Sequence, residues 1–195
     1  MSAFPFLSAS TPAVRRSIAV TTLLLAGALA ACGAEATATE PPAGGGSGDP
    51  FPAQLQGTWI YGIISPTNFY DAYTGQWLSN AYGTSVLFEF APDGKYKQSI
   101  LIATSAYSCR MQVFIYNEGR AVVEGNTIKV YPTKGTVRSQ DNCVVKNNYN
   151  RPDDIASKQG SVYGWTFKLH DDGKTYLLIG PNNDMTNPSY FRHGS

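Results

Sequence analysis

The chain has 195 residues, a formal net charge of +1 and only 15% charged side chains. This balance gives no indication of nucleic-acid binding, of a polybasic membrane patch or of an acidic partner. Tyrosine outnumbers phenylalanine by 12 to 9, and aromatic side chains suit the pleated surface of β-sheets.

The first predicted element is a secretory signal. Arg15 and Arg16 precede an apolar run over residues 18–29, which small residues and Cys32 follow. A run of about 12 apolar residues is too short for the roughly 20 that a transmembrane helix needs. A charged start, a short apolar middle and a small-residue end are typical of a signal peptide, which we expect over residues 1–31.

The end of this segment, Leu29-Ala30-Ala31-Cys32, resembles the lipobox of bacterial lipoproteins. The resemblance implies cleavage before Cys32, a diacylglycerol thioether on its sulfur, and a further acyl chain such as palmitate on the new amino terminus. Two or more acyl chains hold a protein stably on a membrane. The expected location is therefore the bacterial cell envelope, with the membrane as a partner through the lipid anchor. The alternative is an ordinary secretory signal with an incidental cysteine.

Residues 32–52 have the composition of a flexible tether. Gly, Ala, Thr and Pro dominate them without hydrophobic periodicity, so they cannot bury enough apolar surface to offset the entropy lost on ordering. Their glycine-rich run at 44–48 lacks the lysine, strand and helix of a phosphate-binding loop. A folded domain is expected over residues 53–195, which suffice for one hydrophobic core.

Within this domain, short alternating apolar runs separated by turn residues predict antiparallel strands. Asp-Gly turns at 93–94 and 172–173 predict two hairpins, and further turns are expected at 117–119 and 132–135. Alternation places Ile100 and Ile102 on one face of their strand, and Met111, Val113 and Ile115 on one face of the next strand. The strands are expected at 58–64, 85–90, 95–103, 109–116, 121–123, 127–131, 136–139, 164–169 and 174–179.

Three segments have the composition of loops, at residues 66–82, 140–162 and 181–195. One helical turn is expected at 153–159, and no helix is expected after the last strand. The first loop is unusually aromatic, and exposed aromatic side chains mark binding surfaces. The alternative is that this loop folds over the mouth of the domain as a plug.

Eight or nine short antiparallel strands predict an all-β sandwich or barrel. The run Gly57-Thr58-Trp59 resembles the Gly-x-Trp signature of lipocalins, and residues 88–96 and 123–130 resemble hairpins of small bacterial lipocalin-like domains. The resemblance implies a single antiparallel up-and-down β-barrel in which Trp59 closes one end. It also makes Arg192 the candidate for the family's arginine that stacks on this tryptophan. A clear Thr-Asp-Tyr motif is absent.

The chain has three cysteines, Cys32, Cys109 and Cys143, and the first is the predicted site of lipid attachment. If lipid takes Cys32, then Cys109 and Cys143 remain, and an exported chain meets an oxidising compartment in which they form a disulfide. The alternative is two separate buried thiols. Two cysteines and two scattered histidines do not make a zinc site, so no metal is expected.

A barrel of this size either holds one small ligand or is filled by side chains. The first functional expectation is binding of a small apolar or amphipathic ligand without catalysis. The alternative is a structural or interaction module of the cell envelope with a filled core, which docks envelope proteins or peptidoglycan. The candidate ligand-binding residues are Trp59, Tyr61, Phe69, Tyr70, Tyr73, Trp77, Phe88, Phe90 and Trp165.

No enzyme activity, cofactor or nucleic-acid partner is expected. His170 lies at a turn beside Asp171, and His193 lies near the carboxyl end, where both are expected to be solvated. A hydrolytic triad needs a nucleophile, a base and an orienting group within reach of one another. The Gly-x-Ser-x-Gly elbow of esterases is absent.

Overall fold

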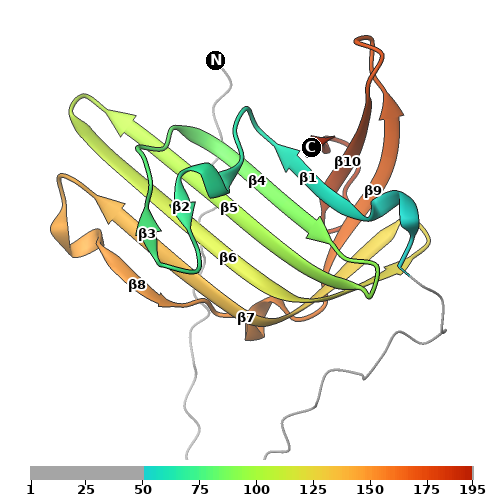
Figure 1. The fold of residues 1–195 in the computed structure, drawn as a ribbon, viewed down its shortest axis with the longest axis horizontal. Coiled ribbons are helices and arrows are strands. Elements are labelled where there is room, and N and C mark those ends of the chain that lie inside the picture. Colours follow the sequence, from blue (N-terminus) through green and yellow to red (C-terminus); the bar gives the residue numbers. More distant parts are fainter. Residues whose placement is uncertain (1–50, 195) are drawn as a thin grey trace, which may run out of the picture. The chain divides into compact units, whose positions relative to one another are not determined.

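The computed structural model describes residues 51–194. The predicted signal peptide, Cys32 and most of the predicted tether lie outside the described residues. The described chain is all-β, as predicted, and its main sheet has nine antiparallel strands, eight of which close in a ring (Figure 1). These strands are β1 (Gly57–Tyr61), β4 (Gly83–Phe90), β5 (Lys95–Ala106), β6 (Cys109–Glu124), β7 (Thr127–Asp141), β8 (Tyr149–Pro152), β9 (Ser161–Leu169), β10 (Thr175–Pro181) and β11 (Ser189–His193).

The ring follows the order of the chain. β1, β4, β5, β6, β7, β9, β10 and β11 neighbour one another in turn, and β11 returns to β1 through the pair Trp59 and His193. The predicted hairpins at the two Asp-Gly turns are confirmed as β4–β5 and β9–β10. The remaining regular elements are the small sheet of β2 (Tyr70–Asp71) and β3 (Gln76–Trp77) and four 3-10 turns: η1 (Ala53–Leu55), η2 (Pro66–Asn68), η3 (Val145–Asn147) and η4 (Ala156–Lys158).

Part of the sheet continues beyond the ring. The first residues of β7 pair with β9, whereas Thr136–Ser139 pair with β8. On the other side, β1 pairs only with residues 86–90 of β4. The long strands β5, β6 and β7 therefore extend beyond their neighbours in the ring (Figure 1). We call residues 100–117 and 136–152, which form this extension, the open end.

Two predicted turns are absent, because β6 and β7 run through them. Residues 117–119 and 132–135 face each other across the β6–β7 pair, and the register shifts between Glu118 and Gly119. A Cβ on Gly119 would overlap the carbonyl oxygen of Tyr131, and a Cβ on Gly135 would overlap the side-chain oxygen of Asn117. The glycines and Pro132 thus permit a bulge and a close strand approach rather than a reversal of the chain.

Other element boundaries also differ from the predictions. β1 ends at Tyr61, three residues early, and β8 and β11 lie in segments that were expected to be loops. The predicted helical turn is confirmed in part as η4. Phe51, assigned to the tether by composition, is buried and stacks on Phe90 with ring centroids 5.3 Å apart. Burial of this ring makes Phe51 part of the folded core.

Candidate functional site

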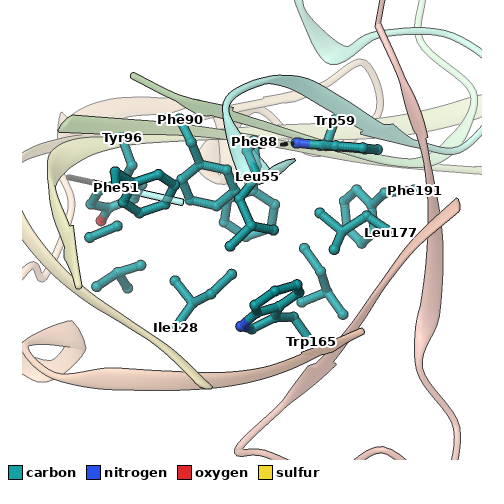
Figure 2. Close-up of a cluster of buried hydrophobic side chains, with 13 residues drawn as sticks. Phe51, Leu55, Trp59, Phe88, Phe90, Tyr96, Ile128, Trp165, Leu177 and Phe191 are labelled. Carbon is teal, nitrogen blue, oxygen red and sulfur yellow. Dashed lines mark hydrogen bonds between the residues drawn. The ribbon is translucent and has the colours of Figure 1, made fainter. Parts of the chain in front are cut away.

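The interior of the ring is filled by side chains. Thirteen buried residues form one cluster, in which aromatic rings from β1, β4 and β9 meet aliphatic side chains from β7 and β10 (Figure 2). Phe88 and Phe90 stack with ring centroids 5.6 Å apart, and Trp165 lies edge-on to Phe167. Four of the predicted ligand-binding residues belong to this cluster: Trp59, Phe88, Phe90 and Trp165.

Trp59 is held by one hydrogen bond and two aromatic neighbours. Its indole Nε1 donates to the carbonyl oxygen of Leu55 at 2.9 Å (Figure 2). Its ring lies 5.6 Å from Phe167 and 5.0 Å from His193, measured between centroids. The expectation that Arg192 stacks on this ring is wrong. Arg192 donates instead to the carbonyl oxygens of residues 62 and 63, and His193 covers the indole.

The aromatic loop at 66–82 covers the outer face of the sheet. Phe69 and Tyr70 are buried there with Leu101 and Phe114, and Trp77 packs against them half-buried. Tyr70 and Phe114 have ring centroids 4.5 Å apart. The alternation of β5 and β6 directs Leu101 and Phe114 away from the ring interior. The loop therefore forms a second small core outside the ring, rather than a plug over its mouth.

Tyr73 is the exposed member of the predicted ligand-binding set. It lies between β2 and β3 and is 85% exposed, and its hydroxyl accepts a hydrogen bond from Lys97 Nζ at 3.2 Å. This contact, and the neighbouring carboxylate of Glu89, raise the pKa of Lys97. On the same outer face, Tyr116 donates to Glu118 at 2.6 Å, which lowers the pKa of the Glu118 carboxyl.

A surface cleft of about 300 Å³ lies where β1 ends and β4 begins. Two of the predicted ligand-binding residues, Tyr61 and Phe69, form part of its wall. The hydroxyl of Ser85 is buried there and has no hydrogen-bond partner among the described residues. No sequence pattern indicates this site, because its walls come from three separate segments. The lining residues are Tyr61, Gly62, Ile63, Ile64, Phe69, Tyr82, Gly83, Thr84 and Ser85.

Beyond the ring, the inner face of the sheet stays apolar but is partly exposed. Ile102 is 40% exposed and Met111 is 38% exposed, whereas Phe88 on the same face is 2% exposed. These side chains share one face of their strands, as predicted, but β1 does not extend far enough to enclose them. We call this surface the open apolar face, and its members are Ile100, Ile102, Met111, Val113, Ile115 and Val137.

The predicted disulfide between Cys109 and Cys143 is confirmed, and it joins the tips of β6 and β7. The carboxylate of Asp141 holds the adjoining turn. It accepts hydrogen bonds from the backbone N–H groups of Cys143 and Val144, both at 2.9 Å, and from the amide of Asn147 at 2.8 Å. These bonds lower the pKa of the Asp141 carboxyl, so the carboxylate is ionised at neutral pH.

The described histidines lie apart from each other. His170 is exposed at the β9–β10 turn, where its Nδ1 lies 3.6 Å from the Asp172 carboxylate and its ring contacts Tyr176. His193 lies against Trp59, as described above. Neither arrangement provides an oriented base beside a nucleophile.

Among residues 51–194, no three His, Cys, Asp or Glu side chains come together as metal ligands. The same stretch contains no helix with the length and hydropathy of a membrane span. No family model, no curated protein and no solved structure matches this chain.

Proposed function

We propose that this chain is a lipid-anchored protein of the bacterial cell envelope, whose lipocalin-like β-barrel is an interaction module without catalysis. The observation that carries the proposal is the filled ring interior together with the exposed open apolar face. A barrel of this strand number is either filled or holds one small ligand. The filled interior favours a function at the surface, and contiguous exposed apolar side chains are typical of interaction sites.

The lipocalin-like assignment draws support from two features. The ring strands follow one another in chain order, which is the connectivity of an up-and-down barrel. Trp59, the tryptophan of the Gly-x-Trp run, is buried in the first strand of the ring, which suits the role of closing one end that the resemblance implies.

The anchor predicts that Cys32→Ser moves the protein from the membrane fraction to the soluble fraction. Without the thiol there is no thioether, and stable membrane attachment requires the acyl chains. Cell fractionation with immunoblotting measures the distribution, and intact mass spectrometry of the wild type measures the added acyl mass. The matched control is the double variant Cys109→Ser/Cys143→Ser, which keeps Cys32 and is expected to stay in the membrane fraction. A wild-type chain without acyl mass would contradict the anchor.

A second candidate function is binding of a small apolar or amphipathic ligand in the surface cleft. The cleft volume of about 300 Å³ lies at the lower end of the range for ligand pockets. Aromatic walls from Tyr61 and Phe69, and the unpartnered hydroxyl of Ser85, favour a largely apolar molecule with one polar group.

Native mass spectrometry of the mature chain distinguishes the two functions. For an interaction module with a filled core, we expect the same protein mass from several expression hosts, without a bound small molecule. A retained small-molecule mass that disappears in the Tyr82→Ala variant would instead support the cleft. Tyr82 suits this test because it lines the cleft and is 59% exposed, so its truncation leaves the ring core intact.

A further inference from the structure

The open end gathers basic side chains that are far apart in the sequence. Arg110 lies in β6, Lys146 in η3 and Arg151 in β8, and Arg138 in β7 is half-buried with its Nε enclosed. Within residues 51–194, none of the four forms an ion pair. The open end contains these four cations and one carboxylate, whereas the rest of the described chain has nine Lys and Arg against ten Asp and Glu. A nearly neutral chain thus carries a net charge of +3 at one end.

The same end carries large apolar and aromatic side chains at its surface. Tyr107, in the β5–β6 turn, is fully exposed, and Val145 in η3 is 79% exposed. Tyr149 is partly exposed and stacks with Arg151, whose Cζ lies 4.9 Å from the ring centroid. Ile102 of the open apolar face lies on the same face of the sheet as Tyr149, because Ile102 pairs with Val113, Val113 with Ser139 and Ser139 with Tyr149. Exposed apolar side chains, tyrosine rings and cations therefore occur together at the open end.

This surface is held in place by covalent and hydrogen bonds. The disulfide Cys109–Cys143 ties the β5–β6 hairpin to the segment after β7, and Figure 1 shows both at the same end of the sheet. The side chain of Asn142 accepts a hydrogen bond from Arg110 N at 2.6 Å and donates one to the Ser108 carbonyl oxygen at 2.9 Å. Because these bonds already fix the backbone of the surface, binding requires little further ordering of the chain, which favours association.

We infer that the open end docks on the surface of a lipid bilayer that contains anionic lipids. Tyrosine rings prefer the headgroup level of a membrane, and aliphatic side chains beside cations suit the boundary between acyl chains and phosphates. Cations near the surface are attracted by anionic headgroups within a Debye length. The inference rests on the proposed function and names the partner of its surface as the bilayer itself. An acidic envelope protein is the competing partner, and the experiment below separates the two.

The tether is long enough for the anchor and the open end to reach the same bilayer. The described chain begins at Phe51, which stacks on Phe90 near the β4–β5 turn, at the end of β5 opposite the open end. β5, over Lys95–Ala106, spans about 40 Å at the usual rise of a strand. Residues 33–50 have a contour length of about 60 Å. The domain can therefore lie along the membrane with its basic end in contact.

The test uses the mature, lipidated chain carrying Tyr107→Trp, mixed with vesicles whose phosphatidylcholine carries bromine on its acyl chains. Bromine quenches an indole that reaches the bilayer. We expect quenching of the introduced indole when the vesicles also contain phosphatidylglycerol, and none when phosphatidylcholine is the only lipid. Of the three native tryptophans, Trp59 and Trp165 are buried and Trp77 is half-buried against Leu101 and Phe114, so the quenching measured for the chain without the Tyr107→Trp substitution is subtracted as the background. Equal or absent quenching in the two kinds of vesicle would overturn the inference.

Two matched variants test which surface reaches the bilayer and whether docking depends on charge. Tyr73→Trp places an indole at another exposed tyrosine, on the β2–β3 hairpin, and is expected to stay unquenched in both vesicles. Lys146→Gln/Arg151→Gln, combined with Tyr107→Trp, removes two cations. Each loss weakens docking about fivefold, so the double variant is expected to dock roughly 25-fold more weakly. Unchanged quenching in the double variant would overturn the electrostatic basis of docking.

The outcomes also separate docking from anchoring. Sedimentation with pure phosphatidylcholine vesicles reports the lipid anchor, whereas quenching of the Tyr107→Trp indole reports the open end. A chain that sediments with the vesicles but whose indole is never quenched would support the lipid anchor and overturn docking by the open end. In that case, an acidic envelope protein that protects the open end from labelling would be the partner.

Discussion

Trp59→Ala is expected to lower the free energy of unfolding by about 3–5 kcal/mol, a large share of the roughly 5–15 kcal/mol that stabilises a domain. The truncation removes the contacts with Phe167 and His193 and leaves a cavity in the ring interior. It also removes the indole N–H that donates to the carbonyl oxygen of Leu55, a buried residue. Urea unfolding followed by circular dichroism measures the change.

Trp59→Phe separates the two contributions. Phenylalanine keeps an aromatic ring in the site but has no N–H donor, so this variant isolates the hydrogen bond together with a smaller cavity. We expect a loss well below that of the alanine variant, with about 1 kcal/mol from the unsatisfied carbonyl. A control at Tyr107, which is fully exposed, is expected to change stability by less than about 0.5 kcal/mol on replacement by alanine. A loss near zero for Trp59→Ala would contradict the packing of the ring.

Removal of the disulfide is the second large expected effect. The bond closes a loop with a sequence separation of 34 residues, which stabilises the fold by about 3–4 kcal/mol in the chain-entropy treatment. Both cysteines are exposed, so serine in their place is solvated and leaves no cavity. We therefore expect the double variant Cys109→Ser/Cys143→Ser to lose about this amount in urea unfolding.

Reduction of the wild type provides the internal check on the disulfide. Dithiothreitol is expected to shift the unfolding midpoint of the wild type to that of the double variant, and to leave the double variant unchanged. The pair Asn142 and Asp141 also holds this region through hydrogen bonds, so the folded signal should persist after reduction. A wild-type midpoint that does not respond to the reductant would contradict the expected contribution.

Much of the strand pattern was predictable because its causes are local. Period-two alternation placed Trp59 and Phe88 on one face, and the register pairs them directly. Asp-Gly turns identified both hairpins, since glycine at the turn tolerates the required backbone conformation. The pairing of Cys109 with Cys143 followed from the cysteine count once Cys32 was assigned to lipid.

Features that depend on distant neighbours were not predictable. Residues 117–119 and 132–135 have turn composition, but each permits a bulge only because the other faces it across the sheet. The aromatic loop packs on Leu101 and Phe114, which no local pattern relates to it. The exposure of Ile102 and Met111 depends on where β1 stops, which alternation within β5 and β6 does not reveal.

The basic character of the open end was likewise hidden in the sequence. Arg110 and Arg151 lie 41 positions apart, and the net charge of the whole chain is +1. Hairpin geometry brings them to one end, because β6, β7 and β8 run back and forth beside one another. Composition reports the sum of charges, whereas binding depends on where the fold places them.

The pairing of the first ring strand with the last sets an order of events for biogenesis. β1 closes the ring by pairing with β11, so Trp59 meets His193 across 134 positions of chain. Forming such a contact carries a high entropy cost, because a long loop must close. Folds dominated by long-range pairing therefore form slowly. A chain that crosses a membrane from its amino terminus onward cannot complete this closure until β11 has emerged. Closure of the sheet therefore waits for the carboxyl-terminal strand, whether a chain emerges from a ribosome or from a translocation channel.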